Sequence, residues 1–175
     1  MSETATTLKA YKRAPSHESS RWYMGNLITF LAEEHETDGH LTLMEVVFAP
    51  GNEPPPHVHS REDEMFYVLE GEFDVYVGDE AFKVKQGECV FLPRFVPHAF
   101  KVRSPRLHLL AILTPGGLEE SFLTMSSAAE RIELPTEMET YLTTDLSKRA
   151  QVLRPYGVRL LSAEEVPSAL PLYPR

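Results

Sequence analysis

The sequence predicts an all-β fold, either a sandwich or a barrel, with a few short helices outside it. Short apolar segments follow one another between residues 22 and 113. Glycines and prolines separate them at regular spacing, as in proteins whose strands are joined by tight turns. Beyond residue 117 the apolar residues recur with helical spacing instead. The chain therefore divides into a strand region and a later helical region.

The expected strands are rich in β-branched and aromatic residues, which favour extended backbone. They span residues 22–30, 41–48, 64–69, 73–77, 81–84, 88–92, 99–102 and 107–113. The segment Val77-Gly78-Asp79-Glu80 is typical of a hairpin connection. Helices are expected over 118–125 and 145–153, the second with Thr144 or Asp145 as its N-cap. We expect both helices to pack outside the strands.

A chain of 175 residues with 42% hydrophobic content has the size and composition of one compact domain. Residues 1–20 are polar and rich in serine and threonine, which predicts a flexible N-terminal arm. The expected organisation is this arm, a β-barrel over 21–116, and a helical C-terminal extension over 117–175 packed on the barrel.

The net charge of −9 argues against a nucleic-acid partner or an anionic membrane surface. The sequence contains no signal-like apolar segment after Met1 and no apolar run of 18 residues, so neither secretion nor membrane spanning is expected. The single cysteine, Cys89, allows no intramolecular disulfide and suits a reducing compartment. We expect a cytoplasmic protein in which Cys89 is a small buried strand residue.

Two histidines and a carboxylate form the first cluster of candidate metal ligands. His57 and His59 are two residues apart, so both imidazoles point to the same face of an extended strand. The polar residues 60–63 between them and Glu64 are suited to a turn. Glu64 then begins a second strand, and its carboxylate returns opposite the histidines.

His98 completes the set from a later strand that follows a turn bounded by two prolines. Three imidazoles and one carboxylate, with room for water or substrate, suit a divalent transition metal. The ligand types do not distinguish among Fe, Mn, Ni, Co, Cu and Zn. We predict that His57, His59, Glu64 and His98 bind one such ion per chain.

At these residues the chain resembles the cupin superfamily. Its first motif is matched by Gly51, His57, His59, Glu64 and Gly71, and its second by Gly87, Pro93 and His98. The chain departs from the usual pattern at Phe95, where Gly is common, and at Val102, where Asn is common. The resemblance covers about residues 41–114 and implies a jelly-roll β-barrel. It also favours Glu64 as the ligand over Glu62 and Asp63, which we expect in a solvated acidic turn.

Strand alternation predicts the surroundings of the metal. If Glu64 points inward, so do Phe66 and Val68, and if His98 points inward, so do Phe100 and Val102. An apolar, partly aromatic lining favours a flat hydrophobic substrate over a sugar or a phosphorylated polyol. The alternative is that these four residues simply fill a small barrel.

Within the cupins, the chain looks most like single-domain proteins similar to quercetin dioxygenase. Residues 22–27, 61–71 and 114–122 and the segment around Tyr156 carry this likeness. It implies a metal-dependent dioxygenase that opens the ring of a flavonol-like aromatic enol, with Glu64 as both ligand and catalytic base and dioxygen as co-substrate. It also implies a homodimer, because cupins commonly pair barrels.

Three alternatives remain open. A different metal-dependent cupin enzyme, such as an isomerase, decarboxylase or hydrolase, would use the same ligands. A thiol dioxygenase fits less well, because that group commonly relies on three histidines without a carboxylate. A non-enzymatic cupin would bind a small molecule and form no product.

Overall fold

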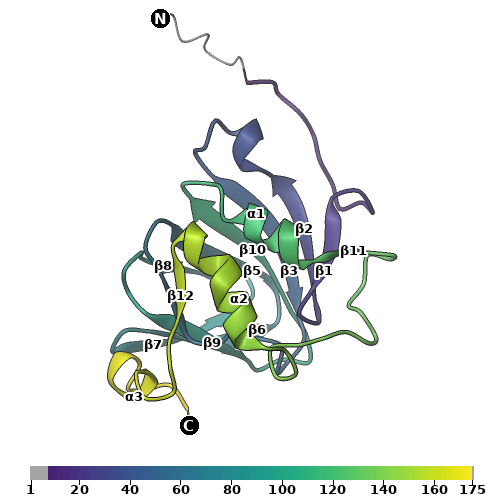
Figure 1. The fold of residues 1–175 in the computed structure, drawn as a ribbon. Coiled ribbons are helices and arrows are strands. Elements are labelled where there is room, and N and C mark those ends of the chain that lie inside the picture. The colour runs from purple at the N-terminus through teal and green to yellow at the C-terminus, as the bar shows by residue number, and fades with distance from the viewer. Residues whose placement is uncertain (1–7, 175) are drawn as a thin grey trace, which may run out of the picture.

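The computed structural model describes residues 8–174 as two antiparallel sheets that face each other, with short helices on one side (Figure 1). The sheets are built from β1 (Ser20–Tyr23), β2 (Asn26–Ala32), β3 (Thr42–Phe48), β4 (His57–His59), β5 (Asp63–Glu70), β6 (Glu72–Val77), β7 (Glu80–Lys85), β8 (Cys89–Leu92), β9 (His98–Val102), β10 (Leu107–Thr114), β11 (Ser127–Ala128) and β12 (Val158–Leu160). The helices are η1 (Glu34–Glu36), α1 (Glu119–Met125), α2 (Leu146–Leu153), η2 (Arg154–Tyr156) and α3 (Val166–Ala169).

One sheet has seven strands in the order β11-β1-β2-β3-β10-β5-β8, and the other has five in the order β12-β4-β9-β6-β7. Neighbouring strands of a sheet are therefore often far apart in the sequence, as in a jelly roll. Within the described residues, no strand pairing joins the two sheets into one cylinder. The predicted all-β jelly-roll fold is confirmed.

The expected strand over 22–30 is two strands. The chain turns at Met24 and Gly25, both with positive φ, so that β1 and β2 form a hairpin. Such a two-residue turn matches the twist of its flanking strands. The turn was not predicted, because the apolar residues on both sides of it resemble one continuous strand. The predicted hairpin at Gly78-Asp79 is present, since Val77 pairs with Glu80.

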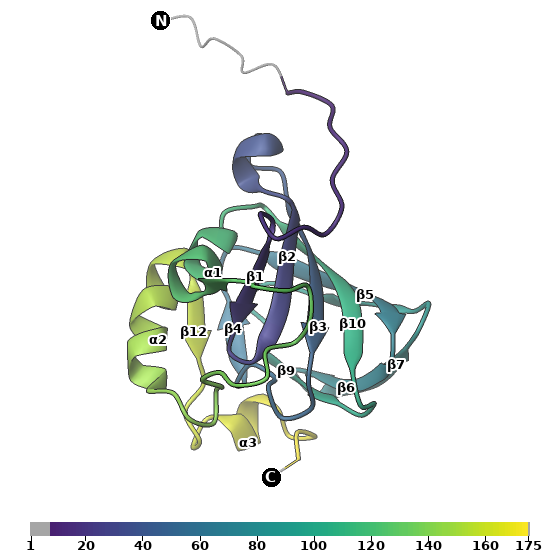
Figure 2. The same ribbon diagram turned by 90° about the vertical axis from the view of Figure 1, so that its right-hand side faces the viewer.

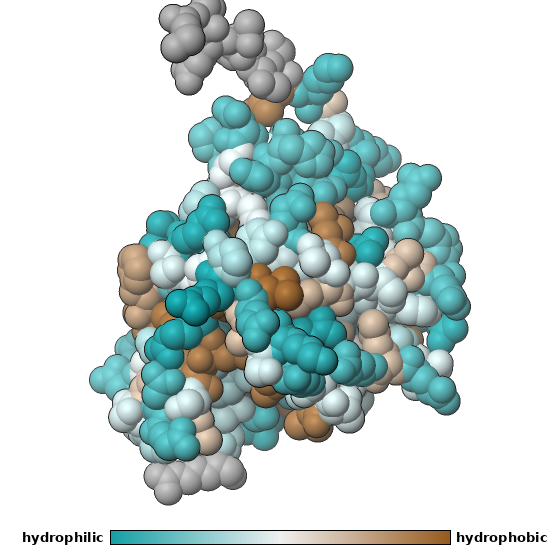
Figure 3. Space-filling view, in the orientation of Figure 1, coloured by the Kyte–Doolittle hydropathy of each residue, from teal (hydrophilic) through white to brown (hydrophobic). Residues whose placement is uncertain are grey.

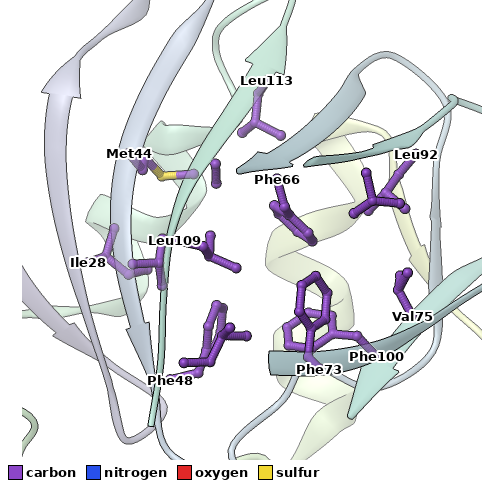
Figure 4. Packing of buried hydrophobic residues seen from close by; sticks show 14 of the residues in the cluster. Ile28, Met44, Phe48, Phe66, Phe73, Val75, Leu92, Phe100, Leu109 and Leu113 are labelled. Atoms are coloured by element: carbon purple, nitrogen blue, oxygen red, sulfur yellow. The ribbon is translucent and has the colours of Figure 1, made fainter. Parts of the chain in front are cut away.

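Aromatic side chains from both sheets meet in the core (Figure 4). The Phe100 ring lies 5.8 Å from that of Phe66, 5.6 Å from that of Phe73 and 5.1 Å from that of Phe48, each edge to face. Phe73 is completely buried. Edge-to-face contacts are the preferred geometry of aromatic pairs, and they hold β5, β6 and β9 against one another.

The C-terminal region places α1 and α2 side by side and adds β12 to the edge of the five-stranded sheet (Figures 1 and 2). Both predicted helices are present, and Asp145 caps α2 by accepting a hydrogen bond from the Ser147 amide. On the face shown in Figure 3, hydrophilic residues predominate and hydrophobic ones are dispersed among them. Among residues 8–174, no helix is both long and apolar enough to cross a membrane.

Of the predicted N-terminal arm, residues 1–7 lie outside the described residues. Residues 8–16 form no helix or strand. Arg13 donates two hydrogen bonds to the Glu36 carboxylate, at 2.7 and 2.5 Å, and so ties this segment to η1. The division into arm, barrel and extension remains a prediction.

Candidate metal centre

Three histidines converge from two adjacent strands of the five-stranded sheet. His57 on β4 is paired directly with His98 on β9, and His59 lies two residues further along β4 on the same face. The Nε2 atoms of His57 and His98 are 3.2 Å apart. The His59 ring lies 5.0 Å from that of His57 and 5.3 Å from that of His98. The register of one strand pair therefore brings all three imidazoles together.

Glu64 reaches the same point from the opposite sheet. It lies on β5, and its Oε2 is 3.5 Å from Nε2 of His98. One ligand atom from each of His57, His59, Glu64 and His98 lies within 4.8 Å of the others. The histidines are buried, whereas Glu64 is half-buried. The four predicted ligands thus form one cluster between the two sheets.

Hydrogen bonds orient the imidazoles. Nδ1 of His57 is 2.8 Å from the Pro55 carbonyl oxygen, and Nδ1 of His98 is 3.2 Å from that of Val96. A carbonyl oxygen only accepts, so Nδ1 carries the proton in both rings and Nε2 offers its lone pair to the cluster. Burial, together with His98 and His59 nearby, holds the pKa of His57 well below its usual value. His57 is therefore neutral at neutral pH, as a metal ligand must be.

The short strand β4 is fixed from both sides. It pairs with β12, where Val158 is opposite His59 and Leu160 is opposite His57. The backbone amide of Phe95 also donates to the His59 carbonyl at 2.7 Å. Phe95 has φ 65° and a 67% exposed side chain, so this turn keeps the left-handed conformation that usually favours glycine, with the ring in solvent.

Gly157 precedes β12, and its carbonyl accepts hydrogen bonds from the amide and the hydroxyl of Ser60. Its φ is +84°, and an added Cβ would lie 2.7 Å from the Ser60 hydroxyl oxygen and 2.9 Å from Arg61. Only glycine combines this backbone conformation with so close an approach. The residue after the histidine strand is therefore tied to the C-terminal extension.

The acidic turn differs from the expectation that Glu62 and Asp63 are solvated. Glu62 is fully buried, and its Oε2 lies 3.4 Å from Nδ1 of His59. Its other oxygen has no hydrogen-bond partner in the described chain, and Nε of Arg61 is 3.8 Å away. Asp63 accepts two hydrogen bonds from the Arg94 guanidinium. Glu62 therefore points inward to the His59 ring, and Asp63 pairs with Arg94 instead of facing solvent alone.

A cavity of about 80 Å³ opens beside the cluster. His57, His59 and Glu64 stand in its wall, and the wall is otherwise mostly apolar. Of the predicted pocket residues, Phe66 and Phe100 line this cavity, whereas Val68 and Val102 are buried in the core and do not.

Part of the cavity wall was not anticipated from the sequence. Tyr23 of β1 belongs to it, as do Phe122 of α1 and Leu153 of α2. Leu118, just before α1, and Tyr141, before α2, complete it. Helical spacing predicts that Phe122 and Leu153 lie on apolar helix faces, but it does not predict which strands those faces pack against. The C-terminal extension thus helps to enclose the cavity.

Other ionisable or reactive side chains lie away from the cluster. Nε2 of His108 is 2.7 Å from Glu45, and Nδ1 of His17 is 3.2 Å from the Ala129 carbonyl oxygen. Cys89 was expected to be buried but is exposed on β8. The alternation of that edge strand turns Val90 and Leu92 inward and leaves Cys89 outside.

Residues 44–113 match the model of the cupin domain. Together with the two-sheet jelly roll, this match shows that this part of the chain has the cupin fold. The matched residues run from β3 to β10 and include all four residues of the candidate metal centre.

Quercetin 2,3-dioxygenases are among the curated proteins that the chain is similar to. The one from Bacillus subtilis (strain 168) is 25% identical over 123 residues, which are 70% of this chain and 36% of that protein. The one from Aspergillus japonicus is 29% identical over 79 residues, 42% of this chain and 23% of that protein. The chain thus matches only a minor part of the length of either relative.

Solved structures support the fold. An RmlC-like cupin from Shewanella frigidimarina NCIMB 400 superposes with a TM-score of 0.54 at 21% identity, covering 65% of this chain and 99% of that one. Streptomyces PAC13 with uridine gives 0.51 at 17% identity, with 71% and 95% covered. At these identities the likeness concerns the fold alone.

Proposed function

We propose that the protein is a metal-dependent dioxygenase that opens the ring of a flavonol-like aromatic enol. The observation that carries this proposal is the position of the ligand cluster in the wall of an otherwise apolar, partly aromatic cavity. Similarity to two quercetin 2,3-dioxygenases supports the reaction class. The proposed co-substrate is dioxygen, both atoms of which enter the product.

The residues present fit one divalent transition metal per chain. Three imidazoles that point Nε2 inward and one carboxylate are a donor set suited to Fe, Mn, Ni, Co, Cu or Zn. Such an ion, when bound, acts as a Lewis acid that stabilises the deprotonated hydroxyl of the enol. His57, His59 and His98 would hold it from one sheet, and Glu64 from the other.

Glu64 is the proposed catalytic base. It is the half-buried member of the cluster and lines the cavity, so its carboxylate can meet a hydroxyl proton of a bound substrate. A carboxylate oxygen that leaves the ligand cluster can accept that proton within hydrogen-bond reach. Phe66 and Phe100 would meanwhile exclude water and contact the flat rings of the substrate.

The size of the cavity adds a condition. Its volume of about 80 Å³ is below the roughly 300–1,000 Å³ of most ligand pockets. A flavonol therefore enters only if part of the wall moves. The small volume also favours the second candidate, another metal-dependent cupin enzyme that acts on a smaller substrate.

The test is aerobic flavonol consumption with product analysis, using protein reconstituted separately with Mn, Fe, Co, Ni, Cu and Zn. We expect metal-dependent ring cleavage that Glu64→Gln abolishes while most of the metal stays bound. The matched control is Asp63→Asn, which alters the adjacent carboxylate and leaves the cluster intact. Full metal occupancy without flavonol loss would reject this reaction, and an unchanged rate in Glu64→Gln would reject the base role.

We also propose that two copies of the chain associate through the outer face of the seven-stranded sheet. One row across four strands of this face is wholly apolar, with Leu43 opposite Ile112, Ile112 opposite Met65, and Met65 opposite Phe91. Met65 and Phe91 are exposed. In Figure 2 the green segment that follows α1 crosses β1 and β2 and turns back beside β3, away from β5.

A contiguous apolar row that ends on the edge strand β8 is a typical protein contact surface. Sedimentation should therefore show a dimer that Phe91→Glu converts to a monomer, whereas a dimer that survives this change would contradict the assignment.

The proposed location is the cytoplasm, a reducing compartment that suits the exposed Cys89.

A further inference from the structure

One hydroxyl in the cavity wall has no hydrogen-bond partner. Tyr23 ends β1, lines the cavity and is only 3% exposed. Its hydroxyl oxygen is buried and makes no hydrogen bond with any of residues 8–174. Buried polar groups are nearly always paired, so an unpaired one in a cavity wall indicates a partner supplied by a ligand or by water.

Packing fixes the position of this phenol. The Tyr23 ring meets the Phe122 ring edge to face at 5.4 Å and the Tyr141 ring at 6.0 Å. The guanidinium carbon of Arg149 lies 5.8 Å from the Tyr23 ring centre. The ring is therefore held by three side chains of the C-terminal extension, and its hydroxyl cannot turn freely to solvent.

The phenol is also kept protonated. Burial raises the pKa of Tyr23, and burial likewise raises the pKa of Tyr141 well above its usual value. The hydroxyls of the two residues are near each other but do not reach hydrogen-bond geometry. At neutral pH the Tyr23 hydroxyl is therefore a neutral group with a proton to donate.

Two other polar side chains besides the metal ligands stand in the cavity wall, Asn26 and Tyr141. Of the two phenols, only that of Tyr23 has a hydroxyl oxygen that is both buried and unpaired among residues 8–174. The amide nitrogen of Asn26 already donates to the carbonyl oxygens of Met24 and Asn52, at 3.2 and 2.8 Å. Tyr23 stands apart from the metal centre, because β2, β3 and β10 separate β1 from β5, the strand of Glu64. Because Tyr23 and the metal ligands line the same cavity, a molecule that fills it can contact both.

We propose that Tyr23 is a specificity-determining residue that donates its hydroxyl hydrogen to an oxygen acceptor on the substrate, remote from the metal-binding group. The substrate class is then an apolar or aromatic body with a metal-binding enol at one end and a hydroxyl, ether or carbonyl oxygen at the other. This inference rests on the proposed function, which supplies the metal-binding end.

The test compares the binding of two probes to the zinc-loaded chain. Unsubstituted flavonol has no hydroxyl on its outer rings, whereas kaempferol has hydroxyls on both. Fluorescence or calorimetric titration should show that the unaltered protein binds kaempferol about two- to thirteenfold more tightly, the range of one added hydrogen bond. Tyr23→Phe should remove this preference.

Tyr76→Phe is the matched control, because Tyr76 is also buried but belongs to a different cluster outside the cavity. It should keep the preference for kaempferol. Circular dichroism and thermal unfolding verify that both variants fold. A preference that survives in Tyr23→Phe, or that is absent from the unaltered protein, would overturn the assignment and leave water as the partner of the hydroxyl.

Binding and turnover are separate measurements, so the two proposals fail separately. Loss of the preference in Tyr23→Phe, with no product under any metal, supports the role of Tyr23 and rejects ring cleavage. Product formation with a preference that Tyr23→Phe leaves intact does the reverse. Binding of neither probe would overturn both.

Discussion

Removing the carboxylate of Glu62 tests how far the metal centre depends on a residue that is not a ligand. Glu62 is fully buried and its Oε2 lies 3.4 Å from Nδ1 of His59. Its role is to hold the His59 ring in the tautomer and orientation that direct Nε2 toward the metal. We therefore expect Glu62→Ala to weaken metal binding although all four ligands remain.

The magnitude follows from the geometry. Loss of an outer carboxylate on a metal-bound histidine typically costs about 10- to 100-fold in affinity. The distance of 3.4 Å is long for such a hydrogen bond. We therefore expect a value near the lower limit, about tenfold or about 1.4 kcal/mol. Glu62→Gln keeps an oxygen that can accept from Nδ1, so its effect should be smaller.

The assay is chelator competition for Zn²⁺, combined with urea unfolding of the metal-free protein. Glu62→Gln replaces a buried carboxyl group that has one unpaired oxygen by an amide of nearly the same shape. The unfolding free energy of its metal-free form should therefore change by less than about 1 kcal/mol. Asp63→Asn, which alters the neighbouring carboxylate, should bind zinc as the unaltered protein does. Unchanged affinity in Glu62→Ala, or an equal loss in Asp63→Asn, would refute the reasoning.

Three further predictions concern stability. Phe73→Ala should lower the unfolding free energy by about 3–5 kcal/mol in urea titrations, because Phe73 is completely buried against Phe66 and Phe100; a loss under 1 kcal/mol would contradict the described core. Gly157→Ala should cost more than Gly87→Ala, because both glycines have a positive φ but only Gly157 has atoms close to an added Cβ. Such overpacking makes the expected excess about 1 kcal/mol or more; equal losses would mean that the close approach of Ser60 does not matter. The Arg13 guanidinium hydrogen-bonded to Glu36 holds the pKa of that carboxyl below its usual value. Because the folded pKa is the lower one, the pair stabilises residues 8–16 above about pH 4.3, the ordinary glutamate pKa, and this contribution is lost as the pH falls through the folded pKa. Protection against hydrogen exchange in this segment, taken relative to the intrinsic exchange rate at each pH, should therefore decrease between pH 7 and pH 3, and Arg13→Ala should decrease it at pH 7 already.

The strand pattern and the ligand spacing were predictable from the sequence. Alternation places His57 and His59 on one face, and the second motif places His98 on a separate strand. The alternation of side chains within a strand does not predict which strands, far apart in the sequence, pair with each other. The direct opposition of His57 and His98, and the approach of Glu64 from the other sheet, follow from the jelly-roll topology.

The surroundings of the ligands were less predictable. A run of polar residues such as 60–63 indicates a turn, but not that Glu62 turns inward to His59. Likewise, the apolar spacing of the C-terminal helices does not say that Phe122 packs against Tyr23. Phe95 shows the converse case: the left-handed turn survives without glycine, because the side chain can extend into solvent.

The most direct test of the central claim is the stoichiometry of metal binding by the four-residue cluster. Metal-free protein is titrated with Co²⁺, followed by absorption spectroscopy, and with Zn²⁺, followed by calorimetry. We predict one equivalent per chain for the unaltered protein and for His108→Ala, a histidine outside the cluster, and no stoichiometric binding after His57→Ala combined with His98→Ala. One equivalent bound by the double variant, or none by the unaltered protein, would contradict the assignment of the metal centre.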